Sequence, residues 1–302
     1  MPMLDFRVET FLAVCRHMNF TKAARELNIT QPAVSHHMHY LEQAYGTALF
    51  QHNGKRLQLT EAGEILRRTL MTMKHDEQHL QKRMQQAASG TRDYSFGATL
   101  SVAEFMINEA LGRFLRLHPD SHIQMQVADT KVLLSKLDSG ELDFAVVEGD
   151  FPKAEYDFFV FGTEEYVAAG DPEKAARYRG CPLTDLLGEP LLLREEGSGT
   201  RVILEYYLKE HGLATADFAR TVEIGNIGAI KTLLKSGYGV SFLYRAAIRP
   251  EEAAGALGVI ALSDFELRHD IMFLFPKNSN FRADYTTIFR ELRACAEETG
   301  GA

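Results

Sequence analysis

The chain has 302 residues, which is longer than one typical domain, and its 45% apolar and 25% charged content is that of an ordinary globular protein. No signal peptide is expected, and no apolar run reaches the ~20 residues that a membrane span needs. Three widely separated cysteines indicate neither a disulfide framework nor a zinc site, so a cytoplasmic protein without a membrane partner is expected. The net charge is -8, but the first 90 residues hold eleven Lys/Arg against eight Asp/Glu, whereas the rest holds 22 against 33. This division predicts a nucleic-acid-binding N-terminal part on an acidic body.

The N-terminal segment is expected to form three helices. A helix over 5–18 precedes two shorter helices between 19 and 42, with a turn at 28–30 between them. Thr30 can cap the second short helix, and Pro32 lies in its first turn, where no backbone donor is needed. A helix with a polar N-terminal face, braced by a partner helix, is typical of a helix-turn-helix that enters a DNA major groove.

The outer face of the second short helix carries the candidate DNA contacts. Val34, Met38 and Leu41 are spaced to face inward, which leaves the polar side chains outside. The candidate contacts are Lys22 in the first short helix and then Thr30, Gln31, Pro32, Ala33, Ser35, His36 and His39. His36 and His39 share a helical face, but two histidines without a third ligand make a poor metal site. Solvated or DNA-facing imidazoles, and no bound metal, are therefore expected.

A hairpin is expected after these helices. The Asn-Gly pair at 53–54 stands between two short apolar segments, 49–50 and 57–59, and this combination is a strong hairpin signal. Lys55 and Arg56 lie near its tip, where they are either phosphate contacts or a solvated pair of loop charges. Beside a helix-turn-helix, the pattern favours a DNA-binding wing.

Several residue patterns of this N-terminal part occur at fixed spacing. They are Asn-Phe-Thr-x-Ala-Ala-x-x-Leu from Asn19, Thr-Gln-Pro-Ala-Val-Ser from Thr30, Leu-Glu at 41–42, Leu-Phe at 49–50, and Leu-Thr-x-Ala-Gly from Leu59. The combination resembles the LysR-type transcriptional regulators. Family members commonly carry Arg where this chain has His36 and His52, so the resemblance does not carry over a base preference at His36.

The resemblance implies a domain order and a set of partners. It implies an N-terminal all-α winged helix-turn-helix in residues 1–60, a linker and dimerisation helix in 61–90, and an α/β effector-binding domain in 91–302. The implied partners are double-stranded DNA with a roughly palindromic operator, a second copy of the chain in a dimer or tetramer, a small-molecule effector and RNA polymerase. The resemblance implies no enzymatic activity and no cofactor.

A long helix follows the hairpin. Thr60 is expected to cap it, and the helix should run to about Ala88, with a hinge at 88–91. An apolar stripe is spaced alternately four and three residues apart, and consists of Leu66, Leu70, Met73, Leu80, Met84 and Ala87. An isolated helix would expose this stripe, so it should pair with a second copy of the chain or pack on the body.

From residue 92 onward, strands and helices alternate. The expected strands are 94–98, 123–127, 142–147, 166–169, 191–193, 240–243 and 265–275, and the expected helices are 102–117, 131–137, 200–210, 227–236 and 283–297. The initial β-α-β-α-β order predicts a parallel sheet covered on both faces. In the family, this body resembles a periplasmic binding protein with two lobes. The resemblance places chain crossings near 161–165 and 265–268, with lobe I at about 91–162 and 268–302 and lobe II at about 163–267.

The candidate effector contacts lie at the ends of strands, because ligands of open α/β sheets bind beyond the carboxyl ends of the strands. They come from four strand ends and one helix start across the cleft, and are Thr99, Ser101, Thr130, Glu148, Ser198, Gly199, Thr200, Arg201 and Asn226. Ser101 also forms a capping-box pair with Glu104, and Thr130 follows Asp129 at a helix start. Helix capping is therefore an equally good interpretation of Ser101 and Thr130.

The most informative strand end is Arg-Glu-Glu-Gly-Ser-Gly-Thr-Arg at 194–201. Its glycines let the backbone approach a ligand, and the helix that begins here offers free backbone donors and the positive end of a dipole. A small anion is the expected guest, and a mere glycine-rich turn with a helix cap is the alternative. Glu148, Glu195 and Glu196 would oppose an anion unless they point away or pair with one of the two arginines.

This segment, together with Val-Glu-Gly at 147–149 and Glu-Ile-Gly-Asn-x-x-Ala-Ile-Lys at 223–231, is similar to one branch of the family. That branch contains regulators of sulfur assimilation and of carbon fixation, whose effectors are small and often anionic. Ser198 lies between two glycines, but its frame is not that of a nucleophile elbow, and no catalytic residues are expected. Two alternatives stay open: an effector-independent DNA-binding protein, and an enzyme or solute-binding body with a docking head.

Overall fold

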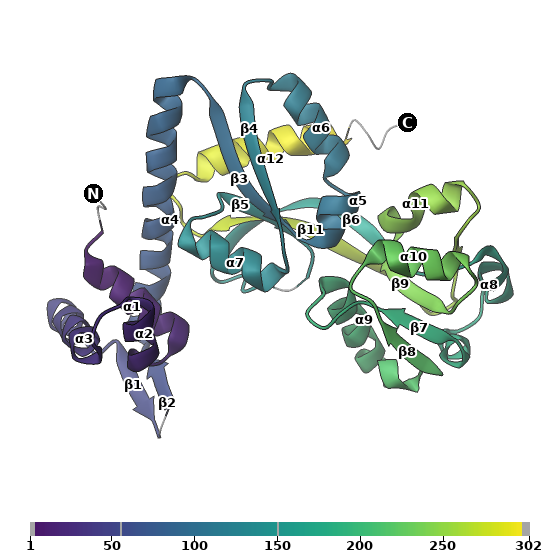
Figure 1. Cartoon of the computed structure of the whole chain (residues 1–302), viewed down its shortest axis with the longest axis horizontal. Coiled ribbons are helices and arrows are strands. Elements are labelled where there is room, and N and C mark those ends of the chain that lie inside the picture. The colour runs from purple at the N-terminus through teal and green to yellow at the C-terminus, as the bar shows by residue number, and fades with distance from the viewer. Residues whose placement is uncertain (1–3, 55, 150, 298–302) are drawn as a thin grey trace.

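The computed structural model describes residues 4–54, 56–149 and 151–297. Figure 1 shows a small N-terminal head, a long helix beside it, and an elongated body of two lobes. The head consists of α1 (Phe6–His17), α2 (Phe20–Glu26), α3 (Gln31–Tyr45), β1 (Phe50–Asn53) and β2 (Arg56–Leu59). Phe11, Val34 and Leu49 are buried together at its centre, which ties α1, α3 and the base of the hairpin into one core. The expected winged helix-turn-helix is confirmed.

The long helix α4 (Glu61–Ser89) begins at Thr60, whose side chain accepts a hydrogen bond from the Gly63 N–H at 3.0 Å. Leu66 and Leu70 of the expected apolar stripe are buried in the head core. Met73 and Met84 of the same stripe are exposed. The stripe is therefore only partly covered within one chain.

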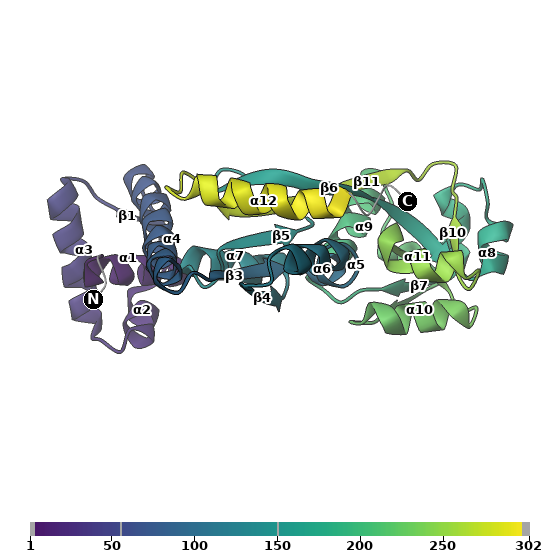
Figure 2. The same ribbon diagram turned by 90° about the horizontal axis from the view of Figure 1, so that it is seen from above.

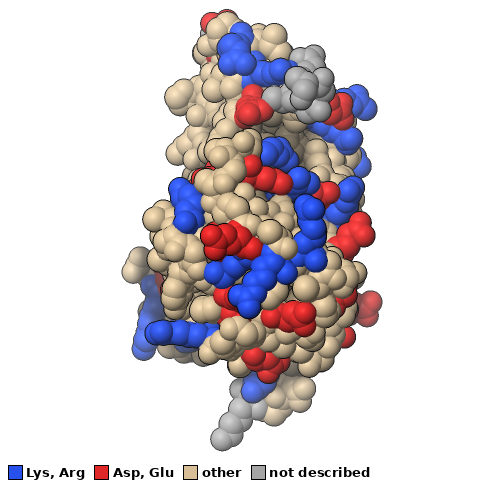
Figure 3. Space-filling model, turned by 90° about the vertical axis from the view of Figure 1, so that its right-hand side faces the viewer, with Lys and Arg blue, Asp and Glu red and all other residues tan. Residues whose placement is uncertain are grey.

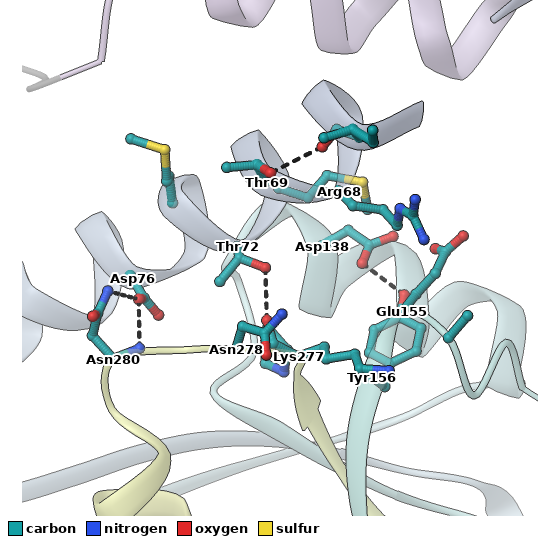
Figure 4. Close-up of a pocket in the computed structure, with 15 residues that line it drawn as sticks. Arg68, Thr69, Thr72, Asp76, Asp138, Glu155, Tyr156, Lys277, Asn278 and Asn280 are labelled. Atoms are coloured by element: carbon teal, nitrogen blue, oxygen red, sulfur yellow. Dashed lines mark hydrogen bonds between the residues drawn. The ribbon is translucent and has the colours of Figure 1, made fainter. Parts of the chain in front are cut away.

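A polar face of α4 packs against the body. His75, Asp76 and His79 are buried there. The Asp76 carboxylate accepts hydrogen bonds from the backbone N–H of Asn280 at 2.9 Å and from its side-chain amide at 2.8 Å. Figure 4 shows this junction, which contains a cavity of about 460 Å³. The cavity is lined by α4, by the loop before α12, and by Asp138 and Tyr156, which are hydrogen-bonded to each other. Polar contacts, rather than an apolar seam, thus fix α4 on its own body.

The body contains a mixed sheet that runs through both lobes. Its strands are β3 (Arg92–Ala98), β4 (Ser121–Val127), β5 (Phe144–Val147), β6 (Tyr156–Gly170), β7 (Pro190–Leu193), β8 (Arg220–Glu223), β9 (Val240–Tyr244), β10 (Gly258–Ile260) and β11 (Leu267–Pro276). The order is β4-β3-β5-β11-β6-β9-β7-β8, with β10 paired to β6. The long strands β6 and β11 are antiparallel to each other and are the segments that pass from one lobe to the other (Figure 1). The strands on either side of them are parallel within each lobe.

Helices cover the sheet in each lobe. They are α5 (Leu100–Phe105), α6 (Asn108–Leu117), α7 (Thr130–Ser139), α8 (Pro172–Arg177), α9 (Gly199–Glu210), α10 (Ile227–Lys235), α11 (Arg245–Ala253) and α12 (Arg282–Glu297), with short 3-10 helices at Leu183–Gly188 and Thr215–Asp217. Figure 2 shows α12 lying between α4 and the second lobe, so the C-terminal segment returns to complete the first lobe. Stacked rings of Phe96, Phe144 and Phe273 fill the core under it, with centroids 5.0 and 4.5 Å apart. The expected two-lobed α/β architecture is confirmed.

Two expected elements differ from the structure. The single helix expected over 102–117 is broken into α5 and α6, because the Ile107 N–H donates to the Val102 carbonyl, five residues back, at 3.0 Å. This widened turn lets the fully buried Ile107 reach the core. The strand expected at 166–169 is the end of the 15-residue β6. Among the described residues, no helix combines the length and apolar character that crossing a membrane requires.

Candidate functional site

Helix α3 lies at the outer edge of the head (Figure 1), and several polar side chains at its start are exposed. Thr30 caps the helix by accepting a hydrogen bond from the Ala33 N–H at 3.3 Å, and Gln31 and Pro32 are exposed. The Gln31 side-chain amide donates to the Ser35 hydroxyl at 2.9 Å. The hydrogen bond keeps these two side chains on one face of the first helical turns.

The remaining candidate DNA contacts surround this face. His36 and His39 are exposed in the same half of α3, and a ring nitrogen of His39 lies 3.0 Å from the Gln43 amide. Lys22 is exposed near the start of α2, where Asn19 caps the helix. Ala23 and Ala24 on the inner side of α2 are buried, and their small side chains let α2 support α3 closely.

The hairpin β1–β2 projects from the head beyond these helices (Figure 1). Gly54 at its tip has φ 61°, a left-handed conformation that glycine adopts without strain. Arg56 is exposed at the start of β2, whereas Lys55 lies outside the described residues. Arg56 is thus available to contact a phosphate group next to the groove that α3 would enter.

Charged side chains of both signs lie on the face of the body that is farthest from the head. Figure 3 views the end of the body farthest from the head, where Lys and Arg side chains alternate with Asp and Glu. Alternating charges neutralise one another locally and do not form the single-sign surface that attracts a nucleic acid. The candidate nucleic-acid contacts lie instead on the head, in α2, α3 and the hairpin.

The lobe I side of the cleft consists of hydroxyl groups around a buried carboxyl. The Thr99 hydroxyl, at the end of β3, donates to the Glu148 carboxylate at the end of β5. The Thr130 hydroxyl donates to the Glu148 carbonyl at 3.2 Å. Burial raises the pKa of Glu148, and hydrogen bonds from Thr99 and Ser101 partly oppose this effect. Ser101 and Thr130 lie within α5 and α7, whose N-cap residues are Thr99 and Asp129, and no side chain caps either helix. Helix capping therefore does not account for Ser101 or Thr130.

Lobe II closes this group from the other side with the start of α9. Ser198 and Thr200 are buried, and their hydroxyl oxygens are 2.9 Å apart. The Ser198 side chain makes no capping hydrogen bond to α9. A Cβ atom at Gly199 would lie 3.3 Å from Oε1 of Glu148, so a side chain here would press the Glu148 carboxyl away by a few tenths of an ångström. Candidates from both lobes are therefore brought together around Glu148.

Two candidates are not brought into this group. Arg201 donates to Glu205 and to Glu223, each at 2.7 Å, and its guanidinium is held by these carboxylates on lobe II. The Asn226 side chain caps α10 by accepting a hydrogen bond from the Ala229 N–H at 2.9 Å. Neither side chain bonds to Glu148.

Two further residues near the cleft were not among the candidates. Arg194 follows β7, is buried, and pairs with both carboxylate oxygens of Glu195 at 2.7 and 2.6 Å. Tyr244 ends β9, and its hydroxyl is buried without a hydrogen bond among the described residues. Both lie at carboxyl ends of parallel strands, so the strand-end rule that selected Thr99 and Glu148 could also have found them. Among the described residues, no group of three metal-ligating side chains is present.

An exposed recognition helix, a wing, a long connecting helix and a two-lobed body with buried polar groups where the lobes meet are typical of an effector-responsive DNA-binding regulator. Residues 7–64 match the family model of the bacterial regulatory helix-turn-helix protein of the lysR family, and residues 88–295 match the LysR substrate binding domain. The chain therefore belongs to the LysR family of transcriptional regulators and is not an enzyme. Its head binds DNA, and its body is an effector-binding domain.

Curated relatives confirm the resemblance to the branch of sulfur-assimilation and carbon-fixation regulators. The RuBisCO operon transcriptional regulator of Acidithiobacillus ferrooxidans is 29% identical, over 97% of this chain and 94% of that protein. The regulator CysL of Bacillus subtilis is 25% identical, over 88% of this chain and 89% of that protein. The regulatory domain of CcmR from Synechocystis, solved in complex with 2-PG, covers 68% of this chain and 98% of that one with a TM-score of 0.61 and 20% identity, which shows the fold of the body.

Proposed function

We propose that this regulator binds a roughly palindromic operator as a dimer, through Gln31, Ser35 and the neighbouring face of α3 together with Lys22 and Arg56. The exposed, hydrogen-bonded Gln31–Ser35 pair at the start of α3 is the observation that supports this contact. Residues 1–60 act as the DNA-binding unit, 61–90 as the linker and 91–302 as the effector unit. The protein works in the cytoplasm.

The linker helix is the proposed dimer contact. Met84 is 66% exposed, and Met73 and Ile65 are also exposed on α4, although each is apolar. Covering these side chains with the same helix of a second chain removes apolar surface from water and brings two heads together. Two heads related by a two-fold axis read two half-sites of one operator. Pairing of two dimers and contact with RNA polymerase complete the proposed assembly.

The effector is proposed to be a small oxyanion bound between the lobes. The convergence of hydroxyl groups from Thr99, Thr130, Ser198 and Thr200 at the start of α9 supports this proposal. A ligand that prefers one lobe arrangement shifts the population of that arrangement and, with it, the angle between paired heads. The regulatory domain of CcmR, which was solved with 2-PG, has this fold and supports a small-molecule site in the body.

A gel-shift experiment tests the DNA contact. The wild type and Ser35→Ala are titrated onto DNA from upstream of the regulator's gene, and Ser35→Ala should bind about tenfold more weakly, because the loss of one base contact costs ~1–3 kcal/mol. Ser236→Ala, at the end of α10 in the body, is the matched control and should bind like the wild type. DNA with one half-site deleted should lose the retarded band at low protein concentration. Equal binding by Ser35→Ala and the wild type would contradict the proposed reading face.

A further inference from the structure

Glu148 occupies the point at which the two lobes meet. It follows the fully buried strand β5 and is only 3% exposed. Its carboxyl is held by the Thr99 hydroxyl on lobe I and lies against Gly199, the first residue of α9, on lobe II. The start of α9 is also the place where an anionic effector would find backbone donors and a positive dipole end. An anion bound at the start of α9 would therefore lie beside this carboxyl.

The charges that face Glu148 do not neutralise it. Arg194 is the nearest cation, but its guanidinium already pairs with both oxygens of Glu195. Arg201 is occupied by Glu205 and Glu223. No salt bridge engages Glu148 in the described part of the chain.

The other titratable groups around Glu148 are an acid and a phenol. Asp129, before α7 on lobe I, carries a carboxylate oxygen 3.9 Å from where a Cβ atom of Gly197 on lobe II would lie. Tyr244 faces it from the end of β9 with a buried hydroxyl that makes no hydrogen bond among the described residues. Burial, and then the nearby Glu148 carboxylate, raises the pKa of Tyr244. None of these groups supplies positive charge at neutral pH.

An oxyanion that enters this space meets a second negative charge in a site shielded from water. Like charges in contact disfavour each other's ionised form, so an anion bound beside Glu148 favours the protonated form of this carboxyl. Burial already raises the pKa of Glu148, which makes this carboxyl the easier one to protonate. A protonated carboxyl also gains a donor, because its O–H can donate a hydrogen bond to an anion.

We propose that the cleft takes its oxyanion effector together with one proton, which comes from solvent and is held on the Glu148 carboxyl. Protonated Glu148 then donates a hydrogen bond to the anion beside the start of α9. This inference rests on the proposed function of the cleft as the effector site. It makes the response of the regulator depend on pH as well as on effector concentration.

Sulfate is a suitable probe, because it does not change its charge between about pH 5.5 and 8.5. Its binding to the full-length protein is measured by calorimetry at constant ionic strength, with the wild type and with Glu148→Gln. For the wild type, the Kd should rise about tenfold per pH unit above the pKa of Glu148, because one proton is taken up with each anion. For Glu148→Gln, the Kd should vary less than about twofold over the same range and should be lower than that of the wild type at high pH.

A matched control separates the cleft from other buried carboxyls. Asp138 is largely buried at the junction of α7 and α4, where it accepts a hydrogen bond from Tyr156 at 2.6 Å. Burial raises the pKa of Asp138 to about 6. Asp138→Asn should keep the pH dependence of sulfate binding seen in the wild type. If Asp138→Asn abolishes it, or if Glu148→Gln keeps it, the proton is not on Glu148 and the proposal is overturned.

A ligand-free measurement keeps the inference distinct from the effector proposal. Because the folded pKa of Glu148 lies above its unfolded value, the wild type should lose thermal stability relative to Glu148→Gln as pH rises above about 4.5. If the difference between the two melting temperatures stays constant as pH rises above about 4.5, Glu148 does not take up the proton and the proposal is overturned. If about 50 mM sulfate binds neither protein at any pH, the proposal of an anionic effector is overturned instead. The melting temperatures then still decide whether Glu148 takes up a proton.

Discussion

His36 has an exposed imidazole on α3, on the face that is proposed to contact DNA. Only a protonated imidazole attracts a phosphate group. We expect operator binding to weaken by about tenfold from pH 6 to pH 8 in the wild type, because a charged hydrogen bond contributes ~1.5 kcal/mol. His36→Gln should lose most of this dependence. Fluorescence anisotropy at constant salt measures both.

The exposed His122 on β4 provides the control for this prediction, since His122→Gln removes an imidazole far from the head. This variant should follow the wild-type pH profile. A wild-type profile that is flat between pH 6 and 8 would exclude a charged contact between His36 and DNA.

Strand-end residues were predictable, but the pairing of their side chains was not. Thr99 and Glu148 follow buried parallel strands, and the ends of such strands meet at one edge of a sheet whatever else the fold contains. Arg201 is held by Glu223, which ends β8, and β8 was not expected from the sequence. The partner of a charged side chain depends on tertiary contacts that local sequence patterns do not contain.

Among the elements, α4 is notable because it packs against the body through buried polar side chains. His75 in its middle is 1% exposed, and its Nε2 lies 2.9 Å from the Leu142 carbonyl oxygen. Burial lowers the pKa of His75 to about 4, although Asp143 and Asp76 nearby favour the protonated form. The unfolded chain takes up this proton near pH 6.5, whereas the folded chain does not until about pH 4. The stability that neutral His75 provides is therefore present above pH 6.5 and is lost as pH falls towards 4.

This shift predicts an acid-sensitive docking of α4. The free energy of unfolding should fall by up to about 3 kcal/mol between pH 6.5 and 4 through this group alone. His75→Gln keeps a donor for the Leu142 carbonyl and removes the titration, so its stability should fall less over the same range. Urea unfolding followed by circular dichroism at both pH values measures the difference. His122→Gln serves again as the control, and a decline in His75→Gln equal to that of the wild type would contradict the prediction.

The extent of α4 could be predicted from the sequence, but its packing face could not. Thr60 and Gly90 mark its two ends, because a hydroxyl cap and a left-handed glycine have local signatures. His75, Asp76 and His79 are polar, and a periodicity of apolar residues assigns such positions to solvent. They are buried because groups of the body, such as Asn280 and Leu142, satisfy their hydrogen bonds.

On the scale of the whole molecule, β5 links the cleft to the linker helix. All four of its residues are buried, and it is paired to β3 and β11. Glu148 follows its carboxyl end at the cleft. Asp143 precedes its other end and accepts hydrogen bonds from Lys82 of α4 at 2.9 Å and from the Ser95 N–H at 2.7 Å. We expect a displacement at one end of this fully packed strand to reach the other end.

Asp143→Asn tests this connection, because it removes the charge that holds Lys82 while it leaves the cleft residues in place. Coupling between an effector and DNA is commonly worth ~1–3 kcal/mol, so an anion that binds the cleft should change operator affinity about tenfold in the wild type. In Asp143→Asn this change should fall below about twofold, while the Kd for the anion itself stays within about twofold of the wild-type value. Operator binding with and without the anion, and calorimetry of the anion alone, separate the two effects.

The matched control is Asp157→Asn, which breaks the ion pair between β6 and Arg282 but does not touch α4. It should retain the full response of operator binding to the anion. If Asp143→Asn also retains that response, the connection does not run through Asp143. The contact between Asp76 of α4 and Asn280 is then the next candidate. If instead Asp143→Asn loses anion binding as well, Asp143 supports the cleft itself, and β5 does not act as a separate link between the effector and the head.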